Sequence, residues 1–205
     1  AVELINNAIN EKGKASIIVA TGASQDDFLN ELINKSKKSI DWRKVSFFHL
    51  DEYIGISENH PASFRRYLKE RLVDLVGPVN EVHYVIGDAK SAESECTRIG
   101  KIIGMHEIDI AFVGIGENGH LAFNDPPANF TDNSPFLVVN LDQKCRMQQV
   151  NEGCFSSLEN VPKEAITMSV QQILKSKNII CMVPDLRKAE AVKNLAETCK
   201  KSNTV

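Results

Sequence analysis

The feature that most constrains this chain is a series of short, unbroken apolar runs, each followed by polar or glycine residues and then by helical periodicity. The clearest runs cover residues 17–20, 45–50 and 108–113. A strand that is apolar without alternation is buried on both faces, as strands of parallel sheets are. Strands that alternate with helices therefore predict an α/β domain with a mostly parallel sheet.

The remaining predicted strands and helices follow the same pattern. Further strands are expected at residues 82–85, 136–141, 165–169 and 179–183. Helical spacing of apolar residues predicts helices over residues 1–12, 26–33, from about 60 to 76, and 91–103, with helical periodicity after the last two strands. Gly13 is expected to close the first helix, and Pro61 to lie in the first turn of the third.

The composition limits the classes of protein that fit. The 205 residues suit one domain spanning 1–205, at roughly 150 residues per domain. With 42% hydrophobic residues and a net charge of −3, the chain is not disordered. No apolar run reaches the roughly 18 residues of a membrane span, and no signal peptide is visible. The balance of 24 basic and 27 acidic residues predicts no nucleic-acid and no membrane partner.

The five cysteines argue against a disulfide framework or a structural zinc site. Their number is odd, their spacing is wide, and no CxxC pair occurs. Reduced thiols in a cytoplasmic protein are the preferred interpretation.

Four predicted strands end in polar or glycine-rich sequence, at residues 21–24, 51–53, 114–120 and 184–188. Ligands of open parallel sheets bind beyond the carboxyl ends of the strands, so these segments are expected to meet at one site. Thr21, Gly22, Ala23 and Ser24 form a strand-to-helix turn whose backbone N–H groups could bind an anion. The alternative is an ordinary turn with Ser24 as the helix N-cap.

Three further positions carry acid–base or charge chemistry. Asp51 and Glu52 follow a strand, where one carboxylate could move a proton; a solvated pair is the alternative. His120 lies in a segment rich in Gly, Asn and Asp, where Asn118 and Asp125 could orient it, and there the functional interpretation is favoured over a tight turn. Lys188 could contact a phosphate as a point charge, although its sequence context alone favours a solvated helix residue.

Several blocks of sequence together resemble the glucosamine-6-phosphate deaminase (isomerase) family. The blocks are HLDEYIG at 49–55, HPASF at 60–64, GIGENGHLAFNDP at 114–126 and VPKEAITM at 161–168, with Lys188 after them. They occur in the family's order and cover nearly the whole chain. The resemblance implies a Rossmann-like three-layer α/β/α sandwich and a cytoplasmic enzyme that needs no metal or organic cofactor. It implies conversion of glucosamine 6-phosphate and water to fructose 6-phosphate and ammonia.

The resemblance also implies roles for individual residues. Asp51 matches the carboxylate that moves the proton between C2 and C1, and His120 matches the histidine that assists ring opening. Asn118 and Asp125 match its supporting residues. The phosphate and substrate contacts are expected from Thr21, Gly22, Ala23, Ser24, Glu52, Gly116, Arg146 and Lys188.

The chain departs from the family pattern in three places. Asp125 stands where glutamate is usual, which shortens the side chain by one methylene and is expected to displace the carboxylate. Gln149 lies near the position of a phosphate-binding arginine, so Arg146, one helical turn earlier, is the expected substitute. The family usually continues beyond residue 205, and this chain starts at Ala1 without Met, so terminal segments are expected to be missing.

Three other functions fit the sequence. One is an isomerase or deaminase of another sugar phosphate, and another is a 6-phosphogluconolactonase-like hydrolase. The third, a non-enzymatic sugar-phosphate sensor, is disfavoured because a binder needs neither Asp51 nor His120. A homo-oligomer is compatible with the sequence.

Overall fold

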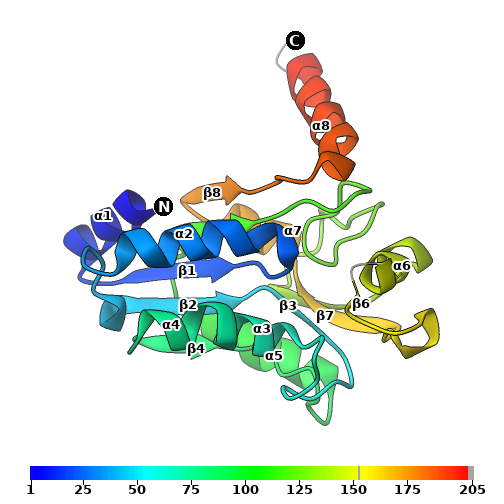
Figure 1. The fold of residues 1–205 in the computed structure, drawn as a ribbon, viewed down its shortest axis with the longest axis horizontal. Coiled ribbons are helices and arrows are strands. Elements are labelled where there is room, and N and C mark those ends of the chain that lie inside the picture. The colour runs from blue at the N-terminus through cyan, green and yellow to red at the C-terminus, as the bar shows by residue number, and fades with distance from the viewer. Residues whose placement is uncertain (152, 203–205) are drawn as a thin grey trace.

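A computed structural model describes residues 1–151 and 153–202, and it contains two sheets (Figure 1). The larger sheet has five strands in the order β4-β2-β1-β5-β8, and every neighbouring pair in it is parallel. Its strands are β1 (Ala15–Val19), β2 (Val45–His49), β4 (Glu81–His83), β5 (Ile110–Val113) and β8 (Asn178–Cys181). The predicted α/β class with a mostly parallel central sheet is confirmed.

Alternation along β1 explains why helices cover both faces of this sheet. Ile17 and Val19 belong to the apolar core on one face, and Ile18 belongs to the core on the other. The first core is closed by α1 (Val2–Lys12), α2 (Asp26–Ser36) and α3 (Phe64–Leu68). The second is closed by α5 (Ala92–Ile103) and α7 (Val170–Leu174). Burial on both faces removes the polar–apolar alternation of a half-exposed strand.

The smaller sheet was not predicted. It joins β3 (Asp51–Tyr53), β7 (Glu164–Met168) and β6 (Phe136–Asn140) in the order β3-β7-β6, and both pairings are antiparallel. The strands expected at 136–141 and 165–169 are present, but they pair antiparallel outside the parallel sheet, and residues 51–53 add a third strand to them. Apolarity reveals that a segment is buried, but it does not reveal the direction in which its neighbour runs.

The third helix begins later than predicted. Ser63 is its N-cap and accepts a hydrogen bond from the backbone N–H of Arg66, so Pro61 lies in the preceding turn. The helix then continues through a π-helical turn (Lys69–Val73) into α4 (Asp74–Val76), the predicted end. The first helix ends at Gly13, which adopts the left-handed conformation as expected.

The other helical segments are α6 (Gln143–Asn151), α8 (Ala189–Ser202) and 3₁₀ turns at Ala23–Gln25, Trp42–Lys44, Leu158–Asn160 and Leu186–Lys188. Figure 1 shows α8 standing away from the body of the molecule. Among the described helices, none has the length and apolar character that a membrane crossing requires. Cys96, Cys145, Cys154 and Cys181 are free thiols, as predicted, whereas the side chain of Cys199 lies outside the described residues.

Gly87 allows the loop after β4 to lie directly on β3, and its replacement tests that packing. A Cβ atom there would overlap the backbone oxygen of Tyr53 and approach the Glu52 Cγ to 2.8 Å. We expect Gly87→Ala to lower the free energy of unfolding by about 1–3 kcal/mol, measured by urea denaturation. Gly100→Ala, in α5, is the control, because its Cβ would make only ordinary contacts with Pro135, at 3.6 Å or more. Equal effects of the two changes would contradict this account.

Candidate active site

A cavity of about 280 Å³ opens where β1, β2 and β5 end, at their carboxyl ends. The structure brings eight of the sequence-predicted site residues to its wall: Thr21, Gly22, Ala23, Ser24, Asp51, Gly116, His120 and Lys188. These residues come from all four of the segments whose convergence was predicted. The cavity wall therefore combines a glycine-containing turn at the start of a helix with carboxyl groups, an imidazole and a lysine.

The turn after β1 places a glycine at the entrance to a helix. Gly22 adopts φ 101°, a conformation that strongly favours glycine, and the chain then enters a 3₁₀ turn that leads into α2. The hydroxyl of Tyr67 donates to Asp26 Oδ1 at 2.6 Å and lies 3.1 Å from the Gly22 carbonyl oxygen, which ties the turn to the start of the helix. Ser24 is not the N-cap of α2; the Gln25 side-chain amide donates to its hydroxyl instead.

Lys188 is buried at the cavity wall, not solvated as its sequence context suggested. Only 7% of the residue is exposed, and it ends a short 3₁₀ turn that follows β8. Within the described part of the chain, no carboxylate forms an ion pair with its ammonium group. Since burying a cation without an ion-pair partner is unfavourable, the ammonium group of Lys188 is available to pair with an anionic ligand.

Asp51 is one of two carboxyl groups that line the cavity, the other being Asp26, and β3 holds it there. It is paired with Thr167 across the β3–β7 ladder and is 5% exposed. Burial, together with the neighbouring charge of Glu52, raises the pKa of Asp51 to about 8. A carboxyl group with a pKa near neutrality can both take up and return a proton.

Glu52 does not line the cavity, contrary to expectation. Successive side chains of a strand point to opposite faces, so Glu52 points to the start of α3 while Asp51 faces the cavity. Its carboxylate accepts hydrogen bonds from the Ser63 hydroxyl and from the backbone N–H groups of Tyr53, Phe64 and Arg65. The Arg65 guanidinium lies 3.5 Å away. These contacts occupy the carboxylate, so Glu52 supports the helix start that forms one wall of the cavity.

His120 is held by two oxygen atoms. Its Nδ1 lies 2.6 Å from Asn118 Oδ1 and 3.1 Å from Asp125 Oδ1, and the Asn118 amide donates to the same carboxylate at 3.0 Å. Both neighbours accept hydrogen bonds, so Nδ1 carries the hydrogen and Nε2 is left for a ligand. Burial acts to raise the pKa of Asp125, but the hydrogen bonds from His120 and Asn118 outweigh it and hold that pKa low.

The loop that carries His120 is fixed to β7. The backbone N–H of Phe123 donates to the Thr167 hydroxyl at 3.1 Å, and the Asn124 amide donates to the Met168 carbonyl at 2.9 Å. The imidazole lies against Gly116, where any side chain would overlap the ring. The glycine is therefore required by close packing within the loop.

Arg146 does not reach the cavity as expected. Its guanidinium donates to the carbonyls of Leu158 and Val161, which fastens α6 to the segment after it. Gln149 does line the cavity and is buried. Sequence reasoning missed the contributions of Ser63 and Tyr67, which come from the start of α3. The sequence signal for them was a serine at the start of a helix, followed one helical turn later by a tyrosine hydroxyl.

Comparison with known proteins identifies the family of the chain. The model of the family described as glucosamine-6-phosphate isomerases/6-phosphogluconolactonase matches residues 1–204. The chain belongs to this family. It is 33% identical over 200 residues to glucosamine-6-phosphate deaminase 1 of Bacillus subtilis, covering 96% of this chain and 81% of that protein. It is 36% identical over 198 residues to the glucosamine-6-phosphate deaminase of Shouchella clausii, covering 95% and 78%.

Solved structures of family members share the fold. A monomeric glucosamine-6-phosphate deaminase superposes with a TM-score of 0.84 at 32% identity, covering 96% of this chain and 81% of that one. A 6-phosphogluconolactonase from Shewanella baltica superposes with a TM-score of 0.74 at 21% identity, covering 94% and 77%. The second comparison bears on the fold alone.

The raised pKa of Asp51 predicts a pH-dependent effect of Asp51→Asn on stability. The folded-state pKa of about 8 lies above the roughly 3.9 of an unfolded aspartate, so the native state holds this proton more tightly. The protonated carboxyl therefore contributes stability that is complete below pH 4 and is lost as the pH rises through 8. Asparagine does not titrate, so the Tm of the variant minus that of the wild type should increase from pH 4 to 8. A difference that stays constant from pH 4 to 9 would contradict the buried, neutral carboxyl.

Proposed function

We propose that this protein is a glucosamine-6-phosphate deaminase, converting glucosamine 6-phosphate and water to fructose 6-phosphate and ammonia. The observation that carries the proposal is that Asp51, His120, Lys188 and the turn at 21–24 line one cavity. The relatives with more than 30% identity bear this name, which supports the same conclusion. Free thiols at the described cysteines suit a cytoplasmic setting, which we include in the proposal.

The anion site would position the substrate by its phosphate. The turn at 21–24 offers backbone N–H groups at the start of α2, and Lys188 adds a positive charge. A phosphate held there places the sugar carbons over the remaining cavity, toward Asp51 and His120. Binding energy from the unreactive phosphate is thereby used to orient the reacting carbons.

His120 would assist ring opening. The reaction requires the open-chain sugar, and the ring oxygen O5 must gain a proton as the C1–O5 bond breaks. With Nδ1 bound to Asn118 and Asp125, the Nε2 atom is the one that can exchange a proton with O5 and the C1 hydroxyl. The Asp125 carboxylate stabilises the imidazolium that forms during the transfer.

Asp51 would then move the proton from C2 to C1. Its carboxylate removes the C2 proton while the C1 carbonyl oxygen gains a proton, which gives an enolamine. The carboxyl group then returns its proton to C1 on the same face, and the nitrogen at C2 gives up a proton to leave an imine. Water adds to this imine and releases ammonia and fructose 6-phosphate. A single buried carboxyl with a pKa near 8 suits both halves of this transfer, because neither protonation state is strongly favoured.

Three alternative functions would each give a different result in an activity assay. A deaminase or isomerase of another sugar phosphate would use the same groups on a different epimer. A 6-phosphogluconolactonase-like hydrolase shares the fold, but the solved 6-phosphogluconolactonase compared above is only 21% identical to this chain. A sugar-phosphate sensor would bind without turnover, and for that the raised pKa of Asp51 and the oriented imidazole serve no purpose.

Ammonia release from glucosamine 6-phosphate, coupled to detection of fructose 6-phosphate, tests the proposal directly. We expect the wild type to form both products in equal amounts and Asp51→Asn to lose turnover by at least about a hundredfold, since it has no proton-transfer group. Asp74→Asn, on the exposed surface of α4, is the matched control and should retain activity. Turnover in Asp51→Asn would refute the assigned role. Turnover only of galactosamine 6-phosphate or 6-phosphogluconolactone would identify the alternatives, and binding without turnover would indicate the sensor.

Removal of the Lys188 charge should weaken substrate binding more than it slows the chemistry. A charge-assisted hydrogen bond contributes roughly 1.5–3 kcal/mol, so Lys188→Met should raise KM about 10- to 100-fold with a smaller change in kcat. Lys101→Met, on exposed α5, controls for loss of one positive charge. The steady-state constants for glucosamine 6-phosphate are measured in both variants. An unchanged KM in Lys188→Met would place the phosphate elsewhere.

A further inference from the structure

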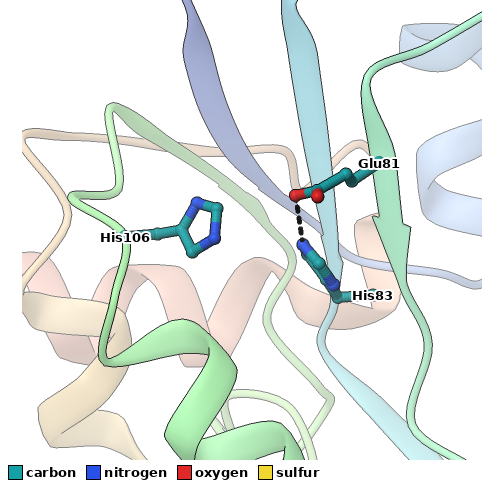
Figure 2. A group of neighbouring side chains, drawn as sticks. All are labelled: Glu81, His83 and His106. Atoms are coloured by element: carbon teal, nitrogen blue, oxygen red, sulfur yellow. Dashed lines mark hydrogen bonds and ion pairs between the residues drawn. The ribbon is translucent and has the colours of Figure 1, made fainter.

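Three potential metal ligands meet on the edge of the parallel sheet, away from the active-site cavity. Glu81 and His83 belong to β4, an edge strand, and His106 lies in the turn between α5 and β5 (Figure 2). One donor atom from each lies within 4.8 Å of the other two. None of the three lines the cavity that holds Asp51 and His120.

The fold itself brings these side chains together. Glu81 and His83 are two residues apart on one strand, so they share a face, and His83 Nε2 lies 3.1 Å from Glu81 Oε2. Both imidazoles pack against the ring of Phe48, with centroid distances of 4.6 Å for His83 and 5.0 Å for His106. The two imidazole centroids are 5.4 Å apart. A shared aromatic platform therefore fixes two rings that come from distant parts of the chain.

The orientation of His106 suits a metal ligand. Its Nδ1 lies 3.3 Å from the Ser16 hydroxyl, and Figure 2 shows its other ring nitrogen facing His83. Metal-binding histidines commonly use one nitrogen for the ion and the other for an orienting hydrogen bond.

The distances are close to those of a tetrahedral site. Zinc bonds of about 2.0–2.2 Å to nitrogen and oxygen place neighbouring donors roughly 3.4 Å apart. The His83–Glu81 pair already meets this spacing. The other pairs of donor atoms lie within 4.8 Å, so His106 and Glu81 need to move closer by little more than an ångström. The side chain of Glu81 is 51% exposed, so it is free to adjust and the site is open to an incoming ion.

We propose that Glu81, His83 and His106 bind a divalent zinc ion that ties the edge strand β4 to the turn before β5. Two imidazoles and one carboxylate form a ligand set that zinc prefers, with water completing the coordination. This site is independent of the cysteines, on whose spacing the expectation of no zinc site was based. Its ligands come from segments more than 20 residues apart, so no local sequence pattern reveals it.

Zinc titration of the metal-free chain at pH 7.5, by competition with a chromogenic zinc indicator, tests the proposal. Changes of even orienting residues weaken metal sites about 10- to 100-fold, so His83→Gln and His106→Gln should each weaken binding at least tenfold. Glu81→Gln should also weaken it. At a free zinc concentration of 100 times Kd, the wild-type Tm should rise by about 5–10 °C, and the histidine variants should lose this shift.

Two controls separate this site from the other places where zinc could bind. His60→Gln and Glu58→Gln remove a histidine and a glutamate outside the cluster, and both should bind zinc as the wild type does. The other described cluster of potential ligands, His120, Asp125 and Cys145, adjoins the active site. Zinc binding that is unchanged in His83→Gln and His106→Gln, or that is absent in the wild type, would overturn the proposal. Nitrogen-15 shifts of the His83 and His106 rings on adding zinc would support it.

Discussion

The pairing of β3 with β7 is the constraint on which the catalytic arrangement depends. Asp51 lies opposite Thr167 in this ladder, and the Thr167 hydroxyl accepts the hydrogen bond that fixes the loop of His120. One strand thus sets the positions of both proposed proton-transfer groups. A slip of one residue in the β3–β7 register would exchange the faces of Asp51 and Glu52, and it would place the wrong carboxylate in the cavity.

The two neighbouring carboxylates show how the fold assigns different chemistry to similar groups. Burial raises the pKa of Glu52, but hydrogen bonds from the backbone N–H groups of the α3 start and from the Ser63 hydroxyl oppose that rise. Asp51 is buried without such compensation, and its pKa rises to about 8. The surroundings push the two groups toward different roles, one supporting the start of α3 and one available for proton transfer. Lys188 is a similar case, because its buried ammonium group is available to bind an anionic ligand.

Sequence reasoning located β1, β2 and β5 because burial on both faces leaves an unmistakable apolar run. It could not detect the antiparallel sheet, since the direction of β6 and β7 depends on contacts with β3 that are distant in sequence. It located the loops that meet at the cavity, because the carboxyl ends of parallel strands share one edge. It misplaced Glu52 and Arg146, whose polar groups are used by local backbone partners. Their charge suggested that they contact a ligand, but the direction of each side chain in the fold brings it to backbone groups instead.

The aspartate at position 125 shows how a departure from a family pattern can be accommodated. A shorter side chain was expected to draw the carboxylate away from His120, yet Asp125 Oδ1 lies 3.1 Å from the imidazole Nδ1. Asn118 connects the two groups: its oxygen approaches the imidazole and its amide donates to the carboxylate. With two acceptors at Nδ1, the orientation of the ring does not depend on the length of one side chain. The asparagine and the aspartate therefore act as a unit, and the loss of one methylene is compatible with a correctly oriented histidine.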